Sequence, residues 1–251
     1  MESIVRGELL WYDIRVEYSI VVRLSEVRSR IEDAAARAGR DADEIQLMAV
    51  TKTQPLDTVV AAWEAGLRCF GENRVHEAFE KYGDREQLER RFPGVDLQMI
   101  GHLQSNKARD AASLFSAVQS VDSVKLARAL SKARDGINQN LGVLLEVNTS
   151  GEEAKYGFTS FGALRDAAQE IVELPGLSLR GLMTMAPYTS DEDPIRRTFR
   201  TLMQWFTDLN ATVPGLGMDV RSMGMSNDYE IAVEEGATLL RLGTVLFGER
   251  L

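Results

Sequence analysis

The chain has 251 residues, of which 44% are hydrophobic and 27% are charged, proportions that are ordinary for a globular protein in water. Its net charge of -9 argues against a nucleic-acid or membrane-surface partner, because either would require a basic face. A single cysteine, Cys69, excludes an internal disulfide and suits a reducing, cytoplasmic compartment, and two histidines without a Cys/His cluster predict no metal site.

The first 19 residues are predicted to form an extension ahead of a single domain that covers residues 20–251. Apolar residues such as Trp11 are interrupted there by charged residues such as Asp13 and Arg15. The segment therefore lacks the apolar core of a signal peptide, and it is too short and too charged to span a membrane. The pattern leaves its degree of order open.

Residues 21–38 are predicted to form the first helix, which ends at Gly39. The residues expected on its buried face are Val22, Val27, Ile31, Ala34 and Ala35.

Behind this helix, short apolar runs alternate with amphipathic segments. Strands are predicted at residues 45–51, 68–71, 96–101, 117–121, 142–147, 178–183, 219–222 and 238–242. Helices are predicted between them at residues 56–65, 75–82, 104–112, 124–133, 161–173, 194–209 and 227–235. Eight such units in about 210 residues favour a single closed (β/α)8 TIM barrel with a parallel sheet, and an open doubly wound sheet is the alternative.

Lys52 lies directly after the first predicted strand, where folds with parallel sheets collect their ligands. Partial burial would lower the proton affinity of its amine and let it condense with an aldehyde. The alternative is a solvent-exposed lysine just past the end of a strand. Small, polar and glycine residues also gather at the other strand ends, as in Gly71-Glu72-Asn73, and this coincidence favours a functional Lys52.

The last two strand ends are typical of a phosphate site. Ser226 lies in a loop that leads into a predicted helix, so its hydroxyl and nearby backbone N–H groups would converge on an anion. Gly243 permits close approach and Thr244 adds a hydroxyl on the neighbouring strand end. Taken alone, Ser226 would be an ordinary helix N-cap and Gly243-Thr244 an ordinary turn, but their adjacency favours phosphate.

A lysine on the first strand, a phosphate cradle on the last two strands and Arg241 beside the cradle suit pyridoxal 5'-phosphate, which has an aldehyde, a phosphate and a ring nitrogen. An arginine that faces the ring nitrogen would keep this nitrogen unprotonated. A neutral pyridine withdraws electrons less strongly than a pyridinium, so the range of reactions would narrow.

Five ordered motifs resemble those of the pyridoxal phosphate homeostasis proteins (the YggS/PROSC-like family). They are Met48-Ala49-Val50-Thr51-Lys52, Phe70-Gly71-Glu72-Asn73-Arg74, Ile100-Gly101-His102-Leu103-Gln104-Ser105-Asn106-Lys107, Ser222-Met223-Gly224-Met225-Ser226-Asn227-Asp228 and Arg241-Leu242-Gly243-Thr244. The resemblance covers residues 21–248 and implies the barrel fold of the alanine racemase N-terminal domain.

The resemblance also implies a role for individual residues. Lys52 would hold pyridoxal phosphate as a Schiff base, and Arg241 would face the pyridine nitrogen. Ser226, Gly243 and Thr244 would bind the phosphate with help from the Met225 backbone, Asn73 would lie near the ring, and Met183 and Met223 would line the pocket.

Two features depart from the family's pattern. Leu97-Gln98-Met99 stands where the family commonly has Trp-His, so any role of that histidine has no counterpart here, although no cofactor ligand is affected. The residues before Ser19 are additional, because the family starts near the first predicted helix.

The resemblance leaves a cofactor carrier and an enzyme to be separated. A racemase needs a base on each face of its substrate. Enzymes of the racemase fold take the second base, a tyrosine, from an additional β domain, for which we expect no room in a chain that ends at Leu251. Tyr156 and Tyr188 are candidate substitutes, although loop packing is the expected role of both.

The leading hypothesis is therefore a cytoplasmic protein, expected to be a monomer and not an enzyme, that holds pyridoxal phosphate reversibly and passes it to apo forms of enzymes that use it. A weak amino-acid racemase or a related enzyme is the alternative. A sugar-phosphate barrel enzyme that forms a Schiff base with its substrate would fit the spacing of Lys52 and the phosphate motifs, but not all five motifs together.

Overall fold

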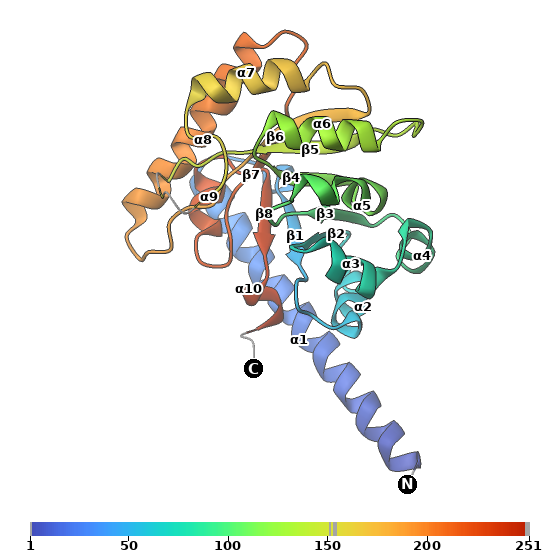
Figure 1. Ribbon diagram of the computed structural model, residues 1–251. Coiled ribbons are helices and arrows are strands. Elements are labelled where there is room, and N and C mark those ends of the chain that lie inside the picture. The colour runs from blue at the N-terminus through green and yellow to red at the C-terminus, as the bar shows by residue number, and fades with distance from the viewer. Residues whose placement is uncertain (1, 151, 153–154, 249–251) are drawn as a thin grey trace.

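The computed structural model describes residues 2–150, 152 and 155–248, with residues 2–19 described by their backbone alone. Eight parallel strands form a closed barrel in which each strand pairs with the next along the chain and the last pairs with the first (Figure 1). The strands are β1 Gln46–Val50, β2 Cys69–Glu72, β3 Asp96–Met99, β4 Ala117–Val121, β5 Leu141–Glu146, β6 Leu177–Met183, β7 Val220–Ser222 and β8 Leu239–Leu242. The predicted closed barrel is confirmed, and the open sheet is wrong.

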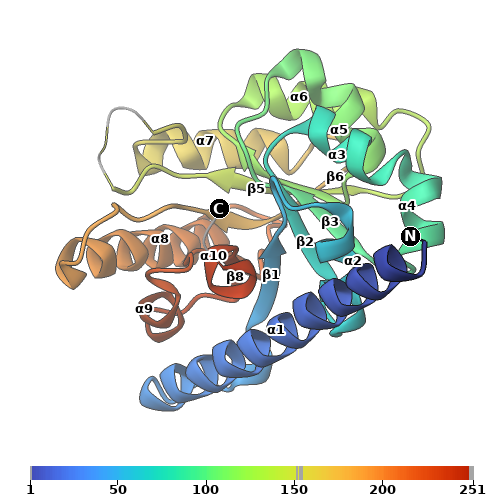
Figure 2. The ribbon, with the colours of Figure 1, turned by 90° about the horizontal axis from the view of Figure 1, so that it is seen from below.

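Helices surround this barrel on the outside, as Figures 1 and 2 show from two directions. They are α1 Glu2–Arg37, α2 Leu56–Glu64, α3 Val75–Tyr82, α4 Arg85–Arg91, α5 Ala108–Leu114, α6 Val124–Ala133, α7 Phe161–Ile171, α8 Glu192–Thr212, α9 Tyr229–Glu234 and α10 Thr244–Phe247, with 3-10 turns η1 Ala42–Glu44 and η2 Ser105–Lys107. Residue 1 of the predicted extension, and residues 151, 153, 154 and 249–251 of the predicted domain, lie outside the described residues. Within the described part of the chain, no helix has both the length and the apolar character that crossing a membrane requires.

Helix α1 begins at Glu2, well before the predicted start near residue 21, and Figure 1 shows its N-terminal part extending beyond the barrel. Among its described side chains, which begin at residue 20, the buried ones are Ile20, Leu24, Val27, Ile31, Ala34 and Ala35. Because they recur every three or four residues, they share one face of the helix. This face leaves out Val22, which is 38% exposed, so the expected burial of Val22 is wrong. Gly39, with a φ of 65°, follows the end of the helix, as predicted.

Two short helices have no counterpart among the predicted elements. Helix α4 buries only Leu88, so its sequence lacks an apolar repeat, and reciprocal hydrogen bonds between Asp84 and Gln87 cap its start. Helix α10 is a single turn directly behind β8, with Leu246 as its buried residue. Elements this short carry too few residues for a periodic signal.

Strand side chains alternate between the interior of the barrel and the helices outside it. A small apolar cluster of Met48, Cys69 and Leu239, with Ile100 and Val220 packed against it, lies inside the barrel. The main apolar core lies between the barrel and its helices. Cys69 is buried, as predicted, and burial raises the pKa of its thiol. The interior also holds the buried polar side chains Gln98, Gln119, Ser222 and Arg241.

Candidate functional site

The predicted site residues lie at one end of the barrel, the carboxyl mouth, where all eight parallel strands end. Lys52 is half-buried and follows β1 by two residues. Gly243 packs beside the end of β1, since a Cβ added to it would lie 3.5 Å from the Val50 carbonyl oxygen. Asn73, also half-buried, follows β2, the other neighbour of β1. The strand order therefore brings Lys52, Asn73 and Gly243 to the same mouth.

A buried polar group, the Glu72 cluster (Thr51, Glu72, Lys81 and Tyr82), holds the backbone next to Lys52 from outside the barrel. Its centre is Glu72 Oε1, which accepts hydrogen bonds from Thr51 Oγ1 at 2.8 Å, Lys81 Nζ at 2.7 Å and Tyr82 OH at 3.1 Å. Lys81 Nζ also donates to the Thr51 carbonyl oxygen at 2.7 Å. Burial raises the pKa of Tyr82, so its phenol keeps its proton and stays a donor. The Thr51 side chain therefore faces outward, toward α3, and Lys52 follows it at the start of the turn.

The chain turns sharply after Lys52. The Gln54 N–H donates to the Thr51 carbonyl oxygen at 3.0 Å and closes a four-residue turn. Thr53, the third residue of this turn, has a φ of 63°, in the left-handed region that a β-branched residue seldom adopts. Backbone strain of this kind gathers at functional sites, which favours a functional role for Lys52 over a purely solvated one.

The loops after β7 and β8 are joined at the predicted phosphate site. The Val245 N–H donates to Ser226 Oγ at 3.3 Å, and the Arg241 N–H donates to the Gly224 carbonyl oxygen at 3.0 Å. Gly224 has a φ of 93°, and a Cβ there would lie 2.6 Å from the Cβ of Ala232. Only glycine fits this position, so the loop can lie close to β8.

Met225 and Thr244 differ in what they offer an anion. The Met225 N–H donates to Asp228 Oδ1 at 2.6 Å, so it is engaged within its own loop, and this geometry does not support the expected help from the Met225 backbone. Burial raises the pKa of Asp228. Thr244, in contrast, is exposed and opens α10 directly after Gly243, so its hydroxyl is accessible to a ligand.

Arg241 lies in the interior of the barrel and is only 5% exposed. Its Nη1 donates to Ser222 Oγ at 2.6 Å, and its Nη2 donates to the Thr184 carbonyl oxygen at 2.7 Å. Burial lowers the pKa of Arg241 to about 10, although the carboxylates of Asp228 and Glu146 raise it. The guanidinium therefore stays charged at neutral pH and acts as a donor in a dry environment.

Glu146, the last residue of β5, belongs to the carboxyl mouth but not to the predicted site residues. Burial and the nearby Asp122 raise the pKa of Glu146 to about 7, while Arg241 lowers it. At the same mouth, His102 Nδ1 lies 3.4 Å from Asp122 Oδ2, and its ring stacks on Tyr156 with 3.8 Å between ring centres. The sequence marks Glu146 as a possible site residue only by placing a carboxylate directly after the largely apolar run 141–145.

The two methionines that were predicted to line the pocket are both buried, at 1% exposure for Met183 and 0% for Met223. Met223 belongs to the main core. Its neighbour Ser222 faces Arg241 in the interior of the barrel, so strand alternation turns Met223 toward the helices. Packing between β7 and the helices accounts for the burial of Met223, and its contribution to the pocket lining stays a prediction.

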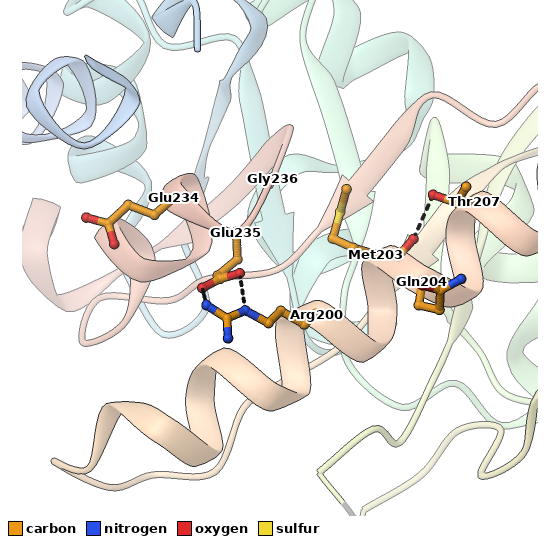
Figure 3. A pocket seen from close by; sticks show the side chains of 7 residues that line it. All are labelled: Arg200, Met203, Gln204, Thr207, Glu234, Glu235 and Gly236. Carbon is orange, nitrogen blue, oxygen red and sulfur yellow. Dashed lines mark hydrogen bonds and ion pairs between the residues drawn. The ribbon is translucent and has the colours of Figure 1, made fainter. Parts of the chain in front are cut away.

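A surface hollow of about 380 Å³ lies away from the carboxyl mouth, between α8 and the end of α9 (Figure 3). Arg200 spans part of it and donates two hydrogen bonds of 2.8 Å to Glu235. Gly236 in its wall precedes β8, at the amino ends of the strands. The hollow is therefore remote from Lys52. Among the described residues, no group of three or more His, Cys, Asp or Glu side chains could hold a metal ion.

Known proteins resemble this chain along nearly all of its length. A family model described as the alanine racemase N-terminal domain matches residues 22–251. The pyridoxal phosphate homeostasis protein of Pseudomonas aeruginosa is 41% identical over 232 residues, which cover 92% of this chain and 96% of that protein. The protein of the same name from Escherichia coli strain K12 is 37% identical over 231 residues, 92% of this chain and 97% of that protein.

Solved structures agree with these relatives. PipY of Synechococcus elongatus, in a structure with PLP bound, has a TM-score of 0.79 at 33% identity and covers 91% of this chain and 100% of that one. An alanine racemase of Clostridium difficile, with a TM-score of 0.69 at 13% identity over 88% of this chain and 55% of that one, shares the fold alone. The chain belongs to the pyridoxal phosphate homeostasis protein family, within the alanine racemase N-terminal domain superfamily.

Proposed function

We propose that this chain binds pyridoxal 5'-phosphate through a Schiff base to Lys52 and serves the homeostasis of this cofactor. The observation that carries the proposal is the convergence of Lys52, Arg241 and the joined loops after β7 and β8 at the carboxyl mouth. Relatives that are named pyridoxal phosphate homeostasis proteins and the PLP-bound structure of PipY support it.

The groups at the mouth match those of the cofactor, which supplies an electron-withdrawing ring when bound. The amine of Lys52 would condense with the aldehyde and release one water. The closely packed loop at Gly224 would bring backbone N–H groups and the Ser226 hydroxyl to the phosphate. The remaining contacts are proposed as Gly243 and Thr244 to the phosphate, Arg241 to the ring nitrogen and Asn73 near the ring.

The same site supports a carrier better than a racemase. A racemase requires a second positioned base opposite its lysine. Tyr188 is 92% exposed and the ring of Tyr156 is stacked on His102, so neither tyrosine is held as such a base would be. In this proposal the protein is a cytoplasmic monomer, and apo forms of enzymes that use pyridoxal phosphate are its recipients.

A weak amino-acid racemase or related enzyme is the second candidate. Glu146 favours it, because a buried carboxyl group with a pKa of about 7 at the mouth could donate or accept a proton near neutral pH.

Attachment to Lys52 can be tested with purified protein and added pyridoxal phosphate. The wild-type protein is expected to turn yellow, and borohydride reduction is expected to fix the cofactor on the peptide that contains Lys52. The variant Lys52→Ala should lose both signals, whereas Lys125→Ala, which removes an exposed lysine of α6, should keep them. Adducts spread evenly over exposed lysines in both variants would reject the proposal.

The carrier and the enzyme differ in proton exchange. The cofactor-loaded protein is incubated with L-amino acids in deuterium oxide. A carrier is expected to leave the α-protons of the amino acids unexchanged, even during an incubation much longer than the time that the cofactor takes to dissociate. If the α-protons exchange as fast as an enzyme turns over, and Glu146→Gln abolishes this exchange, the enzyme is favoured instead.

A further inference from the structure

A hydrogen-bonded network crosses the interior of the barrel and ends at Arg241. This interior network consists of Asp96 and Gln98 on β3, Gln119 on β4, Ser222 on β7 and Arg241 on β8. Its links are Gln98 Nε2 to Asp96 Oδ2 at 2.6 Å, Gln119 Nε2 to Gln98 Oε1 at 2.7 Å, Ser222 Oγ to Gln119 Oε1 at 2.6 Å and Arg241 Nη1 to Ser222 Oγ at 2.6 Å. Because β4 and β7 are not neighbours, the link between Gln119 and Ser222 spans the barrel.

The carboxylate of Asp96 sets the direction of every link. It can only accept hydrogen bonds, and its other oxygen, Oδ1, already accepts one from the Ser116 hydroxyl. The amide of Gln98 therefore turns its NH₂ toward Asp96 and its oxygen toward Gln119. Gln119 must donate to that oxygen, which leaves its own oxygen to accept the proton of Ser222. The Ser222 oxygen thus presents a lone pair to the guanidinium.

This direction matters because the network is shielded from water from Gln98 to Arg241, whereas Asp96 at its far end is only half-buried. Gln119, Ser222 and Arg241 are at most 5% exposed. A buried guanidinium is stable only where acceptors replace the water that it has lost. For Arg241, one acceptor is the main-chain carbonyl oxygen of Thr184, which can only accept a hydrogen bond. The other is the hydroxyl of Ser222, which could instead donate one. The rest of the network makes the Ser222 hydroxyl donate its proton to Gln119, so that its oxygen accepts from Arg241.

We propose that Asp96, Gln98 and Gln119 are positioning residues that fix Ser222 as an acceptor and so hold Arg241, charged and in one orientation, for the contact with the cofactor that the proposed function assigns to it. This inference rests on the proposed function, because it needs pyridoxal phosphate at the carboxyl mouth. It adds that cofactor affinity depends on residues that do not touch the cofactor.

A double-mutant cycle on pyridoxal phosphate affinity tests the inference, with Gln119→Met and Arg241→Met as its two changes. Methionine matches glutamine in length but makes neither amide hydrogen bond. With Arg241 present, Gln119→Met is expected to weaken binding about tenfold, the loss typical of a disturbed hydrogen bond to a charged group, and to shift the absorption band of the bound cofactor. In the Arg241→Met background the same change is expected to have less than about a twofold effect.

A second pair of variants tests the far end of the network. Asp96→Asn is expected to weaken binding about threefold, because an amide no longer dictates the direction of the links. Asp219→Asn is the matched control: it removes the same charge near the amino ends of the strands, but Asp219 is exposed and pairs with Arg180. Its affinity should equal that of the wild type.

The outcomes separate the inference from the proposed function. If the wild-type protein binds the cofactor and Gln119→Met weakens binding equally in both backgrounds, the network has only a structural role and the inference is overturned. If the wild-type protein does not bind the cofactor, the proposed function itself fails. Thermal melting of each apo variant checks folding, and should Gln119→Met not fold, equal affinities of Asp96→Asn and Asp219→Asn would overturn the inference.

Discussion

At the scale of single residues, Lys52 is positioned by groups on the other side of its strand. The ammonium of Lys81 donates both to Glu72 and to the carbonyl oxygen of Thr51, the residue before Lys52. The second oxygen of Glu72, Oε2, is buried and has no hydrogen-bond partner among the described residues. The buried charge of Glu72 therefore depends on Lys81 for its compensation.

Lys81→Met is expected to lower the free energy of unfolding by about 3 kcal/mol or more, because it leaves a carboxylate buried without a cation. It should also weaken cofactor binding, since the Thr51 carbonyl loses the ammonium donor that holds it. Urea denaturation and a cofactor titration measure the two effects. Arg90→Met is the control: its exposed ion pair with Glu86 should contribute less than about 1 kcal/mol. If both variants lose a similar free energy of unfolding, burial of the Lys81–Glu72 ion pair is not what makes it stabilising.

At the scale of elements, the phosphate site depends on how tightly the loop after β7 packs against α9 and β8. A side chain at Gly224 would meet the Cβ of Ala232 on α9 at 2.6 Å and the Cδ2 of Leu240 on β8 at 3.0 Å. The loop after β8 is tied to it through Ser226 and Val245. A small displacement at Gly224 would therefore move both loops together.

Gly224→Ala is expected to destabilise the protein by about 2–3 kcal/mol, because alanine resists a φ of 93° and its methyl group has no space. Cofactor affinity should fall with it, whereas attachment of pyridoxal, which lacks the phosphate, should be nearly unchanged. Gly217→Ala is the matched control, since a Cβ there meets nothing within 4 Å. If Gly224→Ala and the wild type bind pyridoxal phosphate with equal affinity, this loop has no role in phosphate binding.

At the scale of the whole molecule, Glu146 couples stability to pH. Its pKa rises from 4.5 to about 7 on folding, so between these values the folded protein binds more protons than the unfolded chain. The contribution of Glu146 to the free energy of unfolding is fully present below pH 4.5 and is lost as the pH rises through about 7. The free energy of unfolding falls by at most about 1.4 kcal/mol per pH unit in this range.

Chemical denaturation across this pH range should therefore show a decline in wild-type stability that is smaller in Glu146→Gln. Glutamine keeps the shape of the neutral carboxyl group and cannot ionise. Glu86→Gln, at an exposed carboxylate of α4, should retain the wild-type slope. Parallel curves for all three proteins would show that folding does not raise the pKa of Glu146.

Most of the barrel could be predicted because each buried strand is a short apolar run and each longer helix repeats its apolar residues. What escaped prediction depends on contacts between distant segments. The start of α1 and the polar helix α4 have no apolar repeat that marks them.

The predicted site was incomplete for the same reason. Lys52 and the loops after β7 and β8 are local features, visible as a strand end, a glycine or a hydroxyl. The interior network is not local, because Gln119 and Ser222 are 103 positions apart in the chain. A single glutamine within an apolar run gives no sign of which strand lies opposite it.

The pairing of β8 with β1 also governs when the newly made protein can fold. The barrel closes only after residue 242 has left the ribosome, although β1 already ends at Val50. Until then β1 keeps an open edge, and the apolar face of α1 lacks α9 and α10, which cover it in the finished fold. The first and last elements of the chain therefore protect each other, and both of these surfaces stay exposed on the nascent chain until the last elements emerge.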